Sequence, residues 1–130
     1  MPNYTAAVTL LSLALYFFFA TRVAGARGRL GVELPAITGN PEFERIFRVQ
    51  MNTLEWLPIF LGCLWLCAVY LSDRGAAALG LVWVAGRIWY YVGYRQAVEK
   101  RLMGFLVQAI ACILLFVGAA TGIVLRVTAG

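Results

Sequence analysis

The sequence predicts an all-α fold: an integral membrane four-helix bundle that forms a single domain over residues 1–130. Hydrophobic residues make up 62% of the chain and charged residues only 13%, against about 45–50% and ~25% in soluble domains. A soluble domain of this size leaves much of its surface in water and could not hide so much apolar surface. Four apolar stretches are each long enough to cross a bilayer, which takes roughly 17–25 residues.

The first predicted span covers residues 4–24 and carries no charge before Arg22. A secretory signal peptide would place its basic residues ahead of the apolar run. Here they follow it, so we expect a retained helix. The connection to the next span is expected to be largely non-helical, because it holds helix-disfavouring residues at Gly25, Gly28, Gly31, Pro35 and Gly39.

The second predicted span covers residues 42–72 and opens with a helix-start signal, Asn40-Pro41-Glu42. Asn is a preferred N-cap, Pro suits the first helical position, and an acidic residue suits the first turn. The third span, residues 75–98, is interrupted by Arg87. The fourth, residues 102–126, is free of charge up to its last residue, Arg126.

Arg87 is expected to lie within or near the hydrocarbon. The uncharged run before it, residues 75–86, covers only about 18 Å at 1.5 Å per residue, against a core of about 30 Å. A charge there costs at least about 2.5–3.5 kcal/mol. We therefore expect Arg87 to face the bundle and to find a partner, with Glu55 and Glu44 as candidates.

The basic residues predict the orientation in the membrane. Because cytoplasmic loops are rich in Lys and Arg, the first and third connections are expected in the cytoplasm and both termini on the opposite side. The net charge of +5 is then explained by the orientation of the helices in the membrane, and no nucleic-acid partner is expected. The cytoplasmic set is Arg22, Arg27, Arg29, Arg45, Arg48, Arg95, Lys100 and Arg101, and the opposite set is Arg74 and Arg126.

Two polar stripes run along the cytoplasmic ends of the second and third helices, at spacings that place their members on one helical face. Such a face can surround a polar ligand. Alternatively, the stripe of the second helix is only the polar face of a helix that leaves the membrane, with an ion pair between its own Arg48 and Glu55. The second has its own alternative, an interfacial aromatic belt with a snorkelling arginine. The stripes are Arg45, Arg48, Asn52 and Glu55, and then Arg87, Tyr90, Tyr94 and Arg101.

The chemistry of these stripes suits a small zwitterion with several carboxylates. Guanidinium groups clamp carboxylates, Asn and Gln hold amides, Glu binds an ammonium, and Tyr donates hydrogen bonds. Glutathione fits this description, as would other polyanionic ligands. The chain has no histidine, which excludes His-ligated metals and Ser-His or Cys-His catalysis. An arginine can instead favour a thiolate, whose thiol has a free pKa of ~8.5.

These residues resemble the motifs of the MAPEG family, the membrane-associated proteins in eicosanoid and glutathione metabolism. The segment Pro41-Glu42-Phe43-Glu44-Arg45, followed by Arg48, Gln50, Asn52 and Glu55, resembles the family's helix-two motif. The pattern Arg87, Tyr90, Gly93-Tyr94 and Arg101 resembles its helix-three motif at matching spacing. The resemblance covers nearly the whole chain. It is nearest to the branch of microsomal glutathione transferases and leukotriene C synthase.

The resemblance implies a homotrimer that binds glutathione, as cosubstrate and without a metal, at each subunit interface near the cytoplasmic side. The glutathione thiolate would attack lipophilic electrophiles or lipid hydroperoxides that enter from the bilayer. The biological role that this reaction implies is detoxification. By family position Arg101 is the catalytic residue that stabilises the thiolate, with Arg45 and Arg87 in supporting roles. The glutathione-binding residues would be Arg48, Asn52, Glu55 and Tyr90 at the γ-glutamyl end, Arg27, Gln50 and Tyr94 near the glycine carboxylate, and Trp56 beside them.

Two positions depart from the family pattern. Gly28 stands where leukotriene C synthase has the second of two adjacent arginines, so the role proposed there for that arginine at the epoxide has no match. Trp56 follows Glu55 where the family has tyrosine. Because an indole donates a hydrogen bond but accepts none, we expect that contact in altered form.

Two other functions stay open from the sequence. One is a non-catalytic, lipid-binding scaffold of the same family. The other is a small multidrug transporter, which needs a membrane carboxylate for cations. Glu55 is the sole candidate for that carboxylate, and neighbouring arginines would compete for it. The stripe of Arg48, Asn52 and Glu55 together with Arg101 favours an enzyme.

Overall fold

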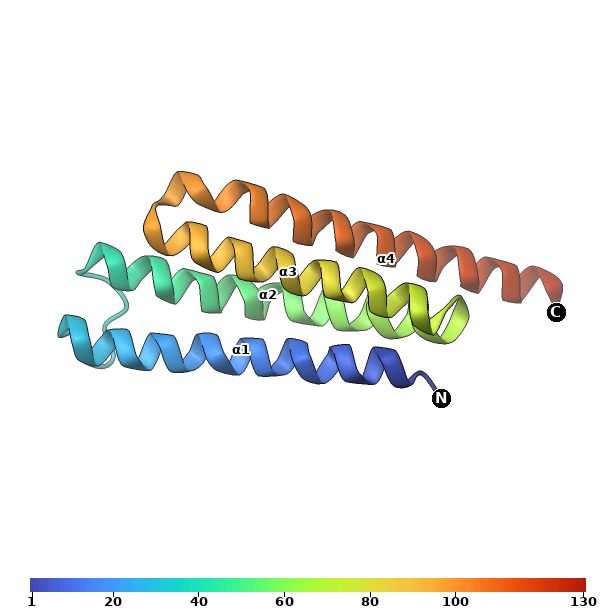
Figure 1. Ribbon diagram of the computed structural model, residues 1–130, viewed down its shortest axis with the longest axis horizontal. Coiled ribbons are helices and arrows are strands. Elements are labelled where there is room, and N and C mark those ends of the chain that lie inside the picture. Colours follow the sequence, from blue (N-terminus) through green and yellow to red (C-terminus); the bar gives the residue numbers. More distant parts are fainter.

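The computed structural model describes all 130 residues and confirms the predicted all-α bundle of four helices (Figure 1). The elements are α1 (Asn3–Leu30), α2 (Pro41–Tyr70), α3 (Asp73–Gln96), the 3₁₀ turn η1 (Val98–Arg101) and α4 (Leu102–Ala129). The helices run alternately up and down, so both termini lie at one end of the bundle. The end where α1 meets α2 and α3 meets α4 is called the polar end below.

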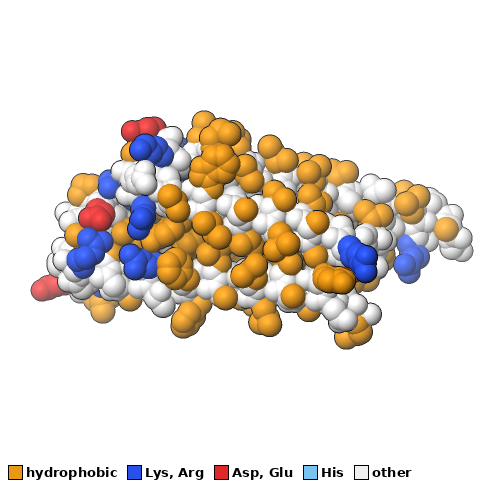
Figure 2. All heavy atoms as spheres, viewed as in Figure 1, with side chains coloured by type: hydrophobic (Ala, Val, Ile, Leu, Met, Phe, Trp, Pro, Cys, Tyr) orange, Lys and Arg blue, Asp and Glu red, His pale blue; other side chains and the backbone are white.

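Each of the four helices is long and apolar enough to cross a membrane, so the chain is an integral membrane protein. Figure 2 shows the distribution expected of such a protein on one face. Hydrophobic side chains cover the middle of the bundle, and charged side chains gather towards its two ends. The surface of the middle is therefore suited to lipid or to another protein chain, and not to water.

The connection between α1 and α2 is shorter than the sequence indicated. The expectation that Gly25 and Gly28 interrupt the helix is wrong, because α1 continues through both to Leu30. A helical glycine costs only about 1 kcal/mol, and the neighbouring Ala and Arg residues favour helix. The helix ends at Gly31, whose φ of 69° is left-handed, and the backbone N–H groups of Gly31 and Val32 both donate to the Arg27 carbonyl.

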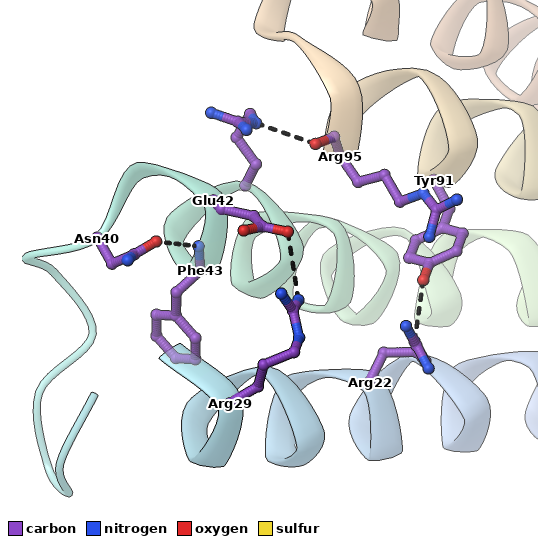
Figure 3. Close-up of polar contacts among 8 residues, drawn as sticks. Arg22, Arg29, Asn40, Glu42, Phe43, Tyr91 and Arg95 are labelled. Carbon is purple, nitrogen blue, oxygen red and sulfur yellow. Dashed lines mark hydrogen bonds and ion pairs between the residues drawn. The ribbon is translucent and has the colours of Figure 1, made fainter. Parts of the chain in front are cut away.

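The start of α2 is as predicted. The Asn40 side chain accepts a 3.1 Å hydrogen bond from the Phe43 backbone N–H, and Pro41 occupies the first helical position (Figure 3). Asn40 thereby satisfies one of the free N–H groups of the first turn. This fixed start sets the register of the polar stripe that follows it along α2.

The middle of the bundle is packed around Trp83 of α3. Its ring stacks on Phe60 of α2 with centroids 3.9 Å apart, and its indole N–H donates to the Gln108 side chain of α4 at 3.0 Å. All three side chains are fully buried. These contacts hold α2, α3 and α4 together below the polar end.

At the polar end α4 lies directly against the backbone of α3. A Cβ added to Gly104 would overlap the backbone of Trp89 and Tyr90, and one added to Gly93 would overlap the Lys100 carbonyl. Only residues without a side chain permit this approach. It brings η1 and the first turn of α4 beside the last turns of α3.

Candidate functional site

A cavity of about 300 Å³ lies at the polar end, between α2, α3 and the start of α4. It is lined by Arg48 and Asn52 from α2, Tyr90 and Tyr94 from α3, Arg101 from η1, and Leu102 and Phe105 from α4. The cavity thus brings together five of the residues that the sequence singled out, from both polar stripes. Two of the seven lining side chains are arginines and none is acidic, so the cavity suits an anion.

Arg87 lies in the bundle behind this cavity and is fully buried. Its guanidinium donates to Asn52 Oδ1 at 2.9 Å and to Thr53 Oγ1 at 2.6 Å, and it sits 4.5 Å from the centroid of the Tyr90 ring. The expectation that Arg87 faces the bundle is confirmed. In the membrane interior such contacts are the means by which a charge is tolerated.

The expectation that Arg87 pairs with an acidic residue is wrong. The residues of α2 that Arg87 reaches are Asn52 and Thr53. Glu55 instead lies 3.6 Å from Arg48, with both side chains about half exposed, and Glu44 accepts from the Gly39 backbone N–H. Both carboxylates stay near water, where their charge is better solvated than it would be in the bundle.

The contact with Arg87 fixes the orientation of the Asn52 amide. A guanidinium has only donors, so the side-chain oxygen of Asn52 must face it. The NH₂ group of Asn52 makes no hydrogen bond within the chain. Asn52 therefore presents a donor to the cavity, which suits a carboxylate or carbonyl oxygen of a ligand.

Arg101 forms the opposite wall. Its Nη1 donates to the Val98 carbonyl at 2.7 Å, and its guanidinium lies 5.9 Å from the centroid of the Tyr94 ring. Tyr94 in turn packs edge-on against Tyr90, with centroids 5.3 Å apart. The 3₁₀ turn thus anchors Arg101 without a carboxylate partner, and its charge is available to a ligand.

Phe105 and Leu102 line the cavity, although sequence reasoning did not identify them. Phe105 packs edge-on against Trp56 at 5.7 Å and lies 6.2 Å from Tyr90 between ring centroids. Its spacing was a usable signal, since Phe105 follows Arg101 by four residues and so shares its helical face. Leu102 and Phe105 give the cavity an apolar side, and Trp56, the residue after Glu55, packs against Phe105.

Arg45 supports the site from outside the main cavity. It donates through Nε to the Arg95 carbonyl at 3.2 Å, which ties the start of α2 to the end of α3. It also lines a second hollow of about 290 Å³ that shares Arg48 and Tyr94 with the main cavity. The two hollows form a polar region that continues towards the start of α2.

Four of the expected binding residues do not line the cavity. Glu55 and Trp56 contact residues that do, Arg48 and Phe105, whereas Arg27 and Gln50 lie apart from it within the chain. Arg27 donates to three carbonyls of the α1–α2 connection, the shortest contact being 2.7 Å to Ala36, and stacks over Phe43 at 4.8 Å. Gln50 is two residues beyond Arg48 on α2, and at about 100° per residue it points to a different side. A single chain therefore brings together only part of the expected set.

Comparisons with known proteins match most of the chain. The model of the MAPEG family matches residues 5–121. Human microsomal glutathione S-transferase 2 is 44% identical over 115 residues, covering 88% of this chain and 78% of the human protein. Bovine leukotriene C4 synthase is 40% identical over 118 residues, covering 91% of this chain and 79% of the bovine protein. An uncharacterised protein of Synechocystis, sll1147, is 48% identical over 120 residues, covering 92% of this chain and 88% of the Synechocystis protein.

Proposed function

The chain belongs to the MAPEG family, and we propose that it is a membrane-bound glutathione transferase whose glutathione thiolate attacks lipophilic electrophiles. The observation that carries this proposal is the cavity lined by Arg48, Asn52, Tyr90 and Arg101, whose lining includes two guanidinium groups and no carboxylate. The names of the human and bovine relatives support the same class of reaction. The same thiolate can also reduce a lipid hydroperoxide, in a glutathione-dependent peroxidase reaction.

Glutathione binding follows from the donors and acceptors at the cavity. Arg48 and the Asn52 NH₂ group bind the α-carboxylate of the γ-glutamyl end, and Glu55, 3.6 Å from Arg48, accepts from its ammonium. The Tyr90 hydroxyl donates to the same end. Tyr94 lies between this end and Arg101, beside the peptide backbone of the ligand. Each charged group of glutathione then meets a group of opposite charge or a matched hydrogen-bond donor.

Arg101 stabilises the thiolate, and the reaction follows. The positive charge favours the thiolate over the thiol, and the released proton goes to water. The sulfur then forms a bond to the electrophilic carbon, and the leaving group departs with the electron pair of the broken bond. With a lipid hydroperoxide, two glutathiones give the disulfide, the lipid alcohol and water. The apolar side formed by Leu102 and Phe105 receives the lipophilic substrate from the bilayer.

The site is completed by a neighbouring subunit in a homotrimer. Arg27 and Gln50 lie away from the cavity of their own chain, and a second copy brings them to the glycine end of glutathione. The polar end faces the cytoplasm, in a bacterial inner membrane or the endoplasmic reticulum, because it carries most of the basic residues. Detoxification of lipid-derived electrophiles is the role that fits this arrangement.

The test is an activity measurement on the purified protein in detergent. We expect glutathione-dependent conjugation of a chlorodinitrobenzene-type electrophile, or glutathione-dependent reduction of a lipid hydroperoxide. Chemical crosslinking of the same sample should give a trimer. Glutathione binding without turnover across a broad panel of electrophiles would instead favour the non-catalytic scaffold.

A further inference from the structure

Tyr91 of α3 stands between two arginines at the polar end, on the side formed by α1 and α3 (Figure 3). Arg22 of α1 donates through Nε to the Tyr91 hydroxyl at 3.1 Å. The Arg95 guanidinium lies 5.4 Å from the centroid of the same ring. Tyr91 itself is buried against Phe18 and Phe19, with centroids 5.9 and 5.1 Å away. The ring is therefore a fixed support that holds both guanidinium groups in place.

Neither arginine is neutralised within the chain. The two ion pairs of the structure are Arg29–Glu42 and Arg48–Glu55, and neither includes Arg22 or Arg95. The two Nη groups of Arg22 make no hydrogen bond, and the Arg95 side chain makes none at all. Both residues are exposed. Two positive charges that share one support and lack an acidic partner fit a single anionic group.

An apolar strip continues from this pair towards the middle of the membrane. Phe18 lies one turn before Arg22 on α1, while Val92 and Ile88 lie one and two turns before Arg95 on α3. These three side chains are each more than two-fifths exposed. On the face shown in Figure 2, hydrophobic side chains cover the middle of the bundle and charged side chains lie towards its ends. The charged pair thus stands where a headgroup meets its acyl chains.

We propose that Arg22 and Arg95 bind the phosphate of an anionic phospholipid, with its acyl chains along Phe18, Ile88 and Val92. Guanidinium groups form bidentate, charge-assisted hydrogen bonds to phosphate oxygens. Arginines near a membrane surface also attract anionic lipids electrostatically. This site lies on the α1–α3 side and shares no residue with the cavity of α2, α3 and α4. The proposal can therefore be tested independently of glutathione binding.

The experiment measures bound lipid by native mass spectrometry. The full-length protein is released from nanodiscs of equimolar phosphatidylglycerol and phosphatidylcholine with identical acyl chains. Wild type should retain phosphatidylglycerol in preference. Arg22→Gln and Arg95→Gln should each lower its retention about fivefold, and the double variant should show no preference. The matched control is Arg74→Gln, an arginine at the opposite end that also lies over a tyrosine; it should retain the wild-type preference.

Three results would overturn the proposal. One is equal retention of both lipids by wild type. The second is an unchanged preference in the double variant, provided that its thermal unfolding matches wild type. The third is complete displacement of the lipid by millimolar glycerol phosphate, which would mean a site for a free phosphate. Glutathione turnover, measured on the same samples, is expected to be unchanged in both single variants and separates this test from that of the proposed function.

Discussion

Arg87 and Asn52 are joined by a 2.9 Å hydrogen bond from Arg87 Nη1 to Asn52 Oδ1, which links the buried interior of the bundle to the wall of the polar cavity. Arg87 is fully buried, and a buried guanidinium must keep its acceptors. The bond therefore determines how Asn52 meets a ligand. Its NH₂ group is left to the cavity, beside the guanidinium of Arg48.

Asn52→Asp is predicted to separate these two roles. The aspartate still accepts from Arg87, so the fold should be retained, but the donor to the cavity is lost and a negative charge replaces it. Loss of a hydrogen bond to a charged ligand group corresponds to roughly a ten- to hundredfold loss of affinity. Isothermal titration with glutathione in detergent measures it. Unchanged affinity, with unchanged thermal stability, would mean that Asn52 does not contact the ligand.

Glu55→Gln is predicted to weaken glutathione binding with little effect on stability. The Arg48–Glu55 pair spans 3.6 Å and both side chains are about half exposed, and exposed pairs contribute only about 0–1 kcal/mol to stability. In the proposed complex, however, Glu55 accepts from the ammonium of glutathione. We expect KM for glutathione to rise about tenfold, the effect of losing one hydrogen bond to a charged group, while the unfolding temperature stays within a few degrees of wild type. A drop in stability without a change in KM would make the pair purely structural.

Gly104→Ala is predicted to disturb the site by displacing α4 from α3. The added Cβ would overlap the backbone of Trp89 and Tyr90, and backbone cannot yield as a flexible side chain does. Overpacking of this kind costs about 1–3 kcal/mol or more, and it moves Arg101 and Phe105 away from α3. The control is Gly62→Ala within α2, where a Cβ would meet nothing within 4 Å. The unfolding temperature and turnover should fall for Gly104→Ala alone, whereas Gly62→Ala should keep its turnover and unfold at the same or a slightly higher temperature, because alanine favours helix over glycine. Equal behaviour of the two variants would contradict this account of the helix contact.

Much of the fold was predictable because the membrane imposes it. A chain with four long apolar stretches has few alternatives to a helical bundle, and the Asn40–Pro41 signal located the start of α2. The end of α1 was not predictable from its glycines, since Gly25 and Gly28 remain helical and only Gly31 adopts the left-handed conformation. Tolerance of a helical glycine depends on its neighbours and on packing, which local composition does not show.

The parts of the site that depend on spacing along one helix were predictable. The parts that depend on contacts between helices were not. The spacing correctly grouped Arg48 with Asn52 and Tyr90 with Tyr94, which line one cavity. It could not identify the partner of Arg87, because the depth at which α3 faces α2 depends on the packing of Trp83 on Phe60. Nor could it show that Arg27 holds its own connection through the Ala36 carbonyl.

Arg101 is proposed to stabilise the thiolate of glutathione bound in the cavity. The most direct measurement is the ultraviolet absorbance of the thiolate when glutathione is added to the purified protein at neutral pH, for wild type and Arg101→Ala. We expect a stoichiometric thiolate signal in wild type. In Arg101→Ala the signal should be lost and turnover should fall about 100-fold, while titration still detects bound glutathione. A wild-type protein that binds glutathione without forming thiolate, or an Arg101→Ala variant that forms it as fully as wild type, would mean that Arg101 does not stabilise the thiolate.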